Sequence, residues 1–175
     1  MVVVEPHNTG WALRFREQAA LLQGALGHRV TAIEHVGSTA IEGLPAKPII
    51  DLAARVAPFV DPFSVEPVIE SLGYRLHLSG PKTHAVYVRA NDAGRTDILH
   101  VFTASDWPTC NQRLIRDKLL HDETARRRYG ELKMRLAAST MTATDYTAAK
   151  LRLVQELLDE ERASRGLPSV DAWEK

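Results

Sequence analysis

The stretch HVGSTAIEGLPAKPIID, residues 35–51, determines the fold of this chain. An apolar run over residues 30–36 leads into Gly37-Ser38-Thr39, which indicates a strand that enters a tight turn. Gly37 can adopt a positive φ and lets a ligand approach the backbone. Ser38 or Thr39 can cap a short helix whose free N–H groups attract anions. The stretch therefore predicts a phosphate-binding turn.

The second half of the stretch predicts another strand. Glycine and proline residues after the turn exclude a long helix. Residues 48–53 are then typical of a largely buried strand that carries one carboxylate, Asp51. A buried strand seldom keeps an aspartate without a partner, so Asp51 is the first candidate for a functional acid. Lys47, in the loop just before it, is a candidate phosphate contact.

Length and composition limit the function classes. The 175 residues suit one domain that needs no disulfides or metals for its core. Because 22 basic and 22 acidic side chains balance, no global field attracts nucleic acid or an anionic membrane, and general nucleic-acid binding is not expected. Cys110 is the single cysteine, which excludes an internal disulfide framework. With no signal peptide or membrane-length apolar run, we expect a soluble, cytoplasmic protein.

The remaining periodicities predict an α+β fold. Apolar spacing predicts a helix from Trp11 to Gly27 and another after Asp61. Strand-like runs follow at 74–78, and at 84–89 and 96–102 as a hairpin. The second hairpin run is apolar on both faces, as in a central strand.

The last third of the chain is predicted to be helical, with helices from 105 or 106 and from about 143 and, between them, another after a break at 121–122. We therefore expect a mixed sheet of four to five strands packed with helices. One domain would span residues 1–166, followed by a loose tail at 167–175.

A strand, a Gly-Ser turn, a short helix and a strand with a carboxylate is the arrangement of polymerase-β-like nucleotidyltransferases. In these enzymes the turn holds the nucleotide phosphates, and acidic residues on neighbouring strands bind Mg²⁺. Active members usually carry two carboxylates separated by one residue, so that both reach one face of the sheet. Here the second position is Ala53. A two-metal site would therefore need a further ligand.

Asp97 and His100 are the candidates for that ligand. They lie three residues apart on an expected strand, so their side chains should point to opposite faces and at most one should reach Asp51. His35, just before the turn, is another candidate. Imidazole is a poor Mg²⁺ ligand but suits Zn²⁺, Mn²⁺ or Fe, and it can also act as a base or hydrogen-bond a phosphate. A site of His35, Asp51 and His100 would be able to bind a metal.

Two cationic residues on the expected helices, Arg116 and Lys150, could complete a lining for phosphate. Tyr146 lies one turn before Lys150 and shares its helix face. Simpler structural interpretations remain open for these residues. Arg116 could form a surface ion pair with Asp117, and Asp51 could be a structural acid bonded to the backbone.

The exact residues of the central stretch also indicate a protein family. EHVGSTAIEGLPAKPIIDL, residues 34–52, closely resembles the signature of the GrpB family. The similarity extends over nearly the whole chain, through Trp11, Leu99-His100-Val101, Arg116-Asp117 and the spacing of Tyr146 and Lys150. This resemblance implies a nucleotidyltransferase-like fold, and its pattern favours His100 over Asp97. It implies no activity, because most members of the family have no assigned activity.

The leading hypothesis is a protein of nucleotidyltransferase fold that binds a nucleotide or another phosphorylated small molecule. Its expected ligand contacts are Gly37, Ser38, Thr39, Lys47, Arg116 and Lys150. If the protein is catalytic, Asp51 and His100 would support nucleotidyl transfer to an unknown acceptor. The expected cofactor is a divalent metal, Mg²⁺ or Mn²⁺, with Zn²⁺ or Fe if the histidines dominate.

Two alternatives remain. Because Ala53 replaces the second acid, the chain could be a non-catalytic module that keeps a degenerate ligand site. It could also be a small-molecule tailoring enzyme that holds a transition metal on His35, Asp51 and His100.

Overall fold

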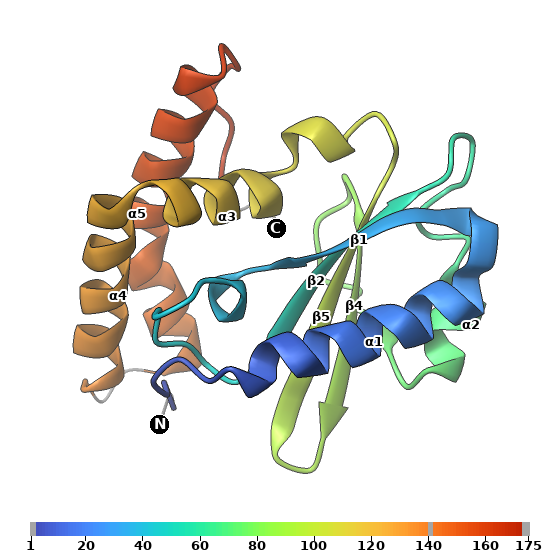
Figure 1. The fold of residues 1–175 in the computed structure, drawn as a ribbon, viewed down its shortest axis with the longest axis horizontal. Coiled ribbons are helices and arrows are strands. Elements are labelled where there is room, and N and C mark those ends of the chain that lie inside the picture. The colour runs from blue at the N-terminus through green and yellow to red at the C-terminus, as the bar shows by residue number, and fades with distance from the viewer. Residues whose placement is uncertain (1–2, 140–141, 173–175) are drawn as a thin grey trace.

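The computed structural model describes residues 3–139 and 142–172, and its centre is a five-stranded mixed sheet (Figure 1). The strands lie in the order β1-β2-β5-β4-β3, and β2 and β5 are parallel whereas the other neighbours are antiparallel. Their bounds are β1 Val30–Val36, β2 Ile50–Val56, β3 Arg75–Leu76, β4 Ala85–Asn91 and β5 Gly94–Phe102.

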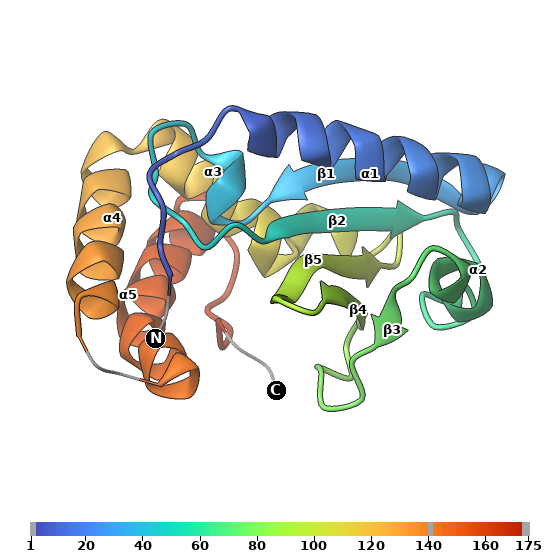
Figure 2. The ribbon, with the colours of Figure 1, turned by 90° about the horizontal axis from the view of Figure 1, so that it is seen from below.

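The helices cover the sheet and extend it at one end. They are α1 Gly10–Leu26, α2 Glu66–Ser71, α3 Asn111–His121, α4 Glu123–Ala137 and α5 Ala143–Ser164. Figure 2 shows α1 lying along β1 and β2, with α4 and α5 side by side at the opposite end from α2. The expected fold class is confirmed: a mixed α+β fold with a helical C-terminal part.

The main core lies between the sheet and α1 and α2. Alternate residues of the central strands point into it, such as Leu52 and Leu99, and both are fully buried beside Trp11 of α1. A second cluster joins the loop before β2 to the helices, because Ile41 and Leu44 pack against residues of α3, α4 and α5. This second cluster fixes the helical layer against the end of the sheet where β2 begins.

Two helices begin later than the sequence predicted. The carboxylate of Asp61 accepts a hydrogen bond from the backbone N–H of Phe63 at 2.9 Å, so it stabilises a local turn, and α2 begins only at Glu66. The helix expected from residue 105 or 106 begins at Asn111, after a 3₁₀ turn over Trp107–Thr109.

The helix break predicted at residues 121–122 lies between α3 and α4, and Asp122 is the N-cap of α4. Its side chain accepts from the backbone N–H of Ala125 at 2.9 Å. The strand expected over 74–78 is shorter, since β3 comprises Arg75 and Leu76, which pair with Val88 and Tyr87 of β4.

The segment after Gly166 was expected to be loose, but its described part, residues 167–172, lies back along α5. The Arg162 guanidinium donates to the carbonyl of Pro168 at 2.6 Å, and the backbone N–H of Ala172 donates to Gln155 at 2.7 Å. The last part of the expected tail, 173–175, lies outside the described residues.

Within the described part of the chain, every helix is too short or too polar to cross a membrane.

Candidate functional site

The predicted turn links the end of β1 to the start of β2. Gly37 has φ 69° and ψ −173°, a conformation that favours glycine, and a 3₁₀ turn over Ser38–Ala40 follows. Thr39 is buried, and its hydroxyl donates to the carbonyl of Ile49 at 3.2 Å. Thr39 therefore ties the turn to the residues just before β2.

Asp51 lies directly under this turn. A Cβ atom added to Gly37 would lie 2.8 Å from both Cβ and Cγ of Asp51. The Asp51 side chain is partly buried. Burial raises the pKa of Asp51 to about 7; the charge of Asp97 adds to this rise, whereas Lys150 and Lys133 oppose it. The turn and the acid of the sequence hypothesis are thus in contact, and two lysines act on the acid.

Three lysines and two tyrosines lie close together, and two of the lysines, Lys133 and Lys150, act on the charge of Asp51. Lys47 and Lys150 place their ammonium groups 4.5 Å and 5.1 Å from the ring centre of Tyr146. Lys150 also lies 3.5 Å from the hydroxyl of Tyr129. The ammonium of Lys133 lies 5.3 Å from the centre of the Tyr129 ring. We call Lys47, Lys133 and Lys150 the lysine cluster.

Lys133 is the most unusual member of the lysine cluster. The residue is only 2% exposed, and its ammonium has no hydrogen-bond partner among the described residues. Burial and the charges of Lys150 and Lys47 lower the pKa of Lys133 to about 7, and Asp51 only partly opposes them. The hydroxyl of Tyr146, also buried, likewise lacks a partner in the part of the chain that the structure describes.

Sequence reasoning missed Lys133, although a signal was present. Tyr129 and Lys133 on α4 repeat the four-residue spacing of Tyr146 and Lys150 on α5. Since residues four apart share a helix face, the two pairs give α4 and α5 similar faces. The repeat could have added Lys133 to the predicted contacts.

His100 faces the same side of the sheet as Asp51, one step further along. The register pairs Ala53 with His100, and side chains alternate along a strand. His84 Nε2 lies 3.1 Å and Gln112 Nε2 lies 3.4 Å from Nδ1 of His100. His100 is therefore held by side chains from just before β4 and from α3. Burial, with the nearby His84, lowers the pKa of His100 to about 3, so the ring is neutral.

His35 and Asp97 lie on the opposite face. His35 pairs with Leu52, and its ring stacks on Phe15 of α1 with centres 4.7 Å apart. Asp97 is fully buried and forms an ion pair with Arg89 at 2.8 Å. Of Asp97 and His100, His100 is therefore the residue on the face of Asp51.

The expected metal site of His35, Asp51 and His100 does not form, because strand alternation separates His35 from the other two side chains. Within residues 3–139 and 142–172, no group of three or more His, Cys, Asp or Glu residues is arranged to hold a metal ion.

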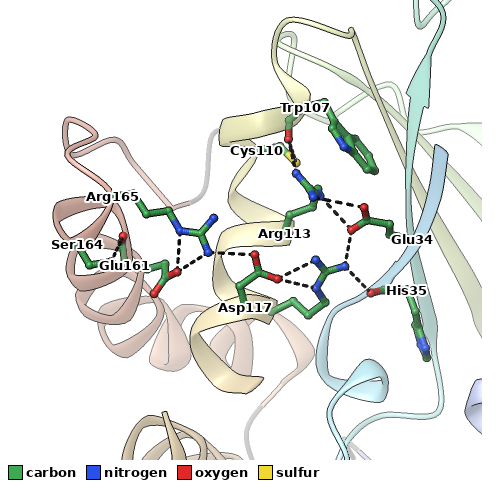
Figure 3. A network of polar contacts seen from close by, with 10 residues as sticks. Glu34, His35, Trp107, Cys110, Arg113, Asp117, Glu161, Ser164 and Arg165 are labelled. Atoms are coloured by element: carbon green, nitrogen blue, oxygen red, sulfur yellow. Dashed lines mark hydrogen bonds and ion pairs between the residues drawn. The ribbon is translucent and has the colours of Figure 1, made fainter. Parts of the chain in front are cut away.

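Arg116, another expected ligand contact, is occupied by carboxylates. Its guanidinium lies 2.6 Å from Glu34 and 2.7 Å from Asp117. Figure 3 shows that Asp117 also pairs with Arg165. Arg113, which lies on α3 like Arg116, also pairs with Glu34. This network joins β1 to α3 and α5. The ion-pair interpretation of Arg116 therefore fits the structure better than a role in ligand binding.

Two surface hollows lie away from Asp51. One, of about 400 Å³, lies between α4 and α5 and includes Arg128, Arg135 and Arg152; the other, of about 410 Å³, lies beside β3 and β4. By contrast, the loop before β2 packs closely on α4, since a Cβ on Gly130 would lie 3.3 Å from Leu44.

Solved structures share this fold. The crystal structure of conserved protein GrpB from Enterococcus faecalis aligns over 94% of this chain and 99% of that chain, with a TM-score of 0.80 and 24% identity. A chain in the structure of a GLD-2/RNP-8 complex aligns over 96% of this chain and 70% of that chain, with a TM-score of 0.59 and 12% identity. At these identities the likeness concerns the fold alone.

Sequence comparisons identify the family. The chain is 32% identical to the glutamate-rich protein GrpB of Alkalihalophilus pseudofirmus, with 91% of this chain and 95% of that protein covered. It is 31% identical to a UPF0157 protein of Halalkalibacterium halodurans, with 92% of this chain and 87% of that protein covered. The profile of the family described as "GrpB protein" matches residues 1–160. The chain therefore belongs to the GrpB family.

Proposed function

We propose that this protein binds a nucleotide or another phosphorylated small molecule where the turn at residues 37–39 meets Asp51 and the lysine cluster. We also propose that its fold is nucleotidyltransferase-like. This fold assignment is supported by the order of β1, the Gly-Ser turn and the neighbouring strand with Asp51, which is the order found in polymerase-β-like enzymes.

The observation that carries the proposal is the buried ammonium of Lys133. A buried polar group without a hydrogen-bond partner destabilises a fold by about 1–3 kcal/mol, and more when it is charged. An anionic ligand would remove this penalty by supplying acceptor oxygens. Lys150 would strengthen the attraction, because its ammonium lies near the hydroxyl of Tyr129, whose ring contacts Lys133. Lys47 would add to it, because it shares the Tyr146 ring with Lys150.

The donor set fits an anion better than a resident divalent metal. On β2 the next side chain on the face of Asp51 is Ala53. Glu34 is the β1 residue paired with Ala53, and its carboxylate is held by Arg113 and Arg116. Asp51 therefore lacks a second free carboxylate on these strands, and the lysine cluster repels cations. We accordingly propose ligand binding without a protein-held metal, and we favour the non-catalytic alternative over nucleotidyl transfer.

Isothermal titration with AMP and ATP at pH 7 tests this function, with and without Mg²⁺. We expect saturable binding to the wild type and at least tenfold weaker binding to Lys150→Met, which keeps the length of the side chain and removes its charge. The matched control is Lys82→Met, since Lys82 is an exposed lysine elsewhere in the chain. Absence of binding to the wild type, or equal binding to both variants, would contradict the proposal.

A further inference from the structure

The charges around the site define what kind of anion it suits. With every group ionised, the three ammonium groups of the lysine cluster and the carboxylate of Asp51 leave a net charge of two positive units. Arg95 acts on Lys47 but is itself exposed. The enclosed part of the site is therefore matched to an anion of about two negative charges.

We infer that the ligand is a phosphate monoester dianion, bound without a divalent metal, and that Lys133 is its innermost contact. This inference rests on the proposed function. A phosphate monoester carries roughly −1.5 to −2 charge at pH 7. A nucleoside triphosphate carries more charge and usually needs Mg²⁺ bridging its phosphates, for which the single carboxylate of Asp51 and the lysine cluster provide poor support.

Two buried donors without partners match the oxygens of such a group. They are the ammonium of Lys133, in a residue 2% exposed, and the hydroxyl of Tyr146, in a residue 1% exposed. They belong to one site, because Lys150 lies near both the Tyr146 ring and the Tyr129 hydroxyl, and the Tyr129 ring contacts Lys133. A terminal phosphate has three acceptor oxygens, enough for both donors and for Lys150.

Binding should also change the protonation of Lys133. The groups that act on its charge are Lys150 and Lys47, which oppose protonation, and Asp51, which favours it. A dianion beside Lys133 would favour the charged ammonium. At a pH above 7, the bound protein should therefore carry one more proton on this side chain than the free protein.

Calorimetry without metal tests the ligand class. Inorganic phosphate, AMP and ribose 5-phosphate are titrated in EDTA, and AMP and ATP are repeated with Mg²⁺. We expect AMP and ribose 5-phosphate to bind in EDTA, AMP to keep the same affinity when Mg²⁺ is added, and ATP to bind at least tenfold more weakly. Tighter binding of ATP with Mg²⁺ than of AMP would overturn the inference and leave the proposed function standing. No binding of any probe would overturn both.

A second measurement tests Lys133. At pH 8, the AMP titration is repeated in two buffers of different ionisation enthalpy, and the difference in heat gives the number of protons taken up. With a pKa of about 7 in the free protein, we expect an uptake of about one proton by the wild type. Lys133→Met should take up no proton and should bind AMP at least tenfold more weakly than the wild type. Lys82→Met should retain the proton uptake. Binding without proton uptake, or unchanged in Lys133→Met, would overturn the role of Lys133. A circular dichroism melt confirms that each variant is folded.

Discussion

The backbone of Gly37 lies against the carboxylate of Asp51, so closely that no side chain fits between them. Gly37 has φ 69°, and a Cβ there would lie 2.8 Å from Cγ of Asp51. The turn that ends β1 and the acid that begins β2 therefore form one unit, although the two residues are separated by a loop.

Gly37→Ala should destabilise the protein by about 1–3 kcal/mol or more, because it adds backbone strain and displaces Asp51. Gly43→Ala is the matched control, because Gly43 has φ 76° but open space around it. Urea unfolding of both variants separates strain from the steric clash. Equal losses of stability would show that contact with Asp51 contributes nothing.

Arg89→Ala should be among the most destabilising substitutions in the sheet. It leaves the carboxylate of Asp97, which is fully buried, without its ion pair at 2.8 Å. Removing one partner of a buried pair typically lowers the free energy of unfolding by about 3–5 kcal/mol. Arg75→Ala is the control, since Arg75 is exposed and lies 3.9 Å from Glu70; its effect should stay within about 1 kcal/mol. Urea unfolding measures both effects, and similar losses in the two variants would refute this role for Arg89.

Three histidines should each lower the free energy of unfolding as the pH drops from about 6.5 toward 4. Burial lowers the pKa of His35 and of His84 to about 4, and that of His100 to about 3, each from the ordinary value of 6.5. Between the lowered pKa of the folded protein and the ordinary value of 6.5, the unfolded chain binds more protons than the folded protein, so acid favours unfolding. Above pH 6.5 these histidines are neutral in both states and the loss of stability is absent.

His84→Gln should flatten this dependence and remove about 2 kcal/mol of the difference between pH 7.5 and pH 4.5. His121→Gln, at an exposed position, is the control. Urea unfolding at the two pH values is the measurement. A slope that is identical in His84→Gln and the wild type would exclude His84 as a source of acid sensitivity.

Ala53→Asp should create a divalent metal site, in contrast to the metal-free site that we propose for the wild type. Ala53 is fully buried and faces the side of Asp51, so the substitution places two carboxylates two residues apart on β2. We expect Mn²⁺ binding detectable by electron paramagnetic resonance, with a loss of stability of about 1–3 kcal/mol from the buried charge. Ala53→Asn adds the same bulk without the charge and should bind no metal. Stoichiometric Mn²⁺ binding by the wild type would refute the metal-free site.

The sequence was most informative where local chemistry decides structure. The strand, turn and strand around residues 35–51 follow from an apolar run, a glycine that tolerates positive φ, and prolines that stop a helix. The β4–β5 hairpin and the helix break at Asp122 follow in the same way, because turn formers and a capping side chain act over a few residues. Asp61 shows the limit of such rules, since the same side chain can serve a helix cap or a local turn.

The sequence alone thus determined the fold class, the family and the two ends of the central stretch, Gly37 and Asp51, since these depend on neighbours along the chain. Tertiary structure decided which side chains meet. Strand register put His100 on the face of Asp51 and His35 on the other, and the packing of the helices buried Lys133 beside the Tyr129 ring. Register and burial depend on contacts between residues far apart in the chain, and periodicity does not encode those contacts.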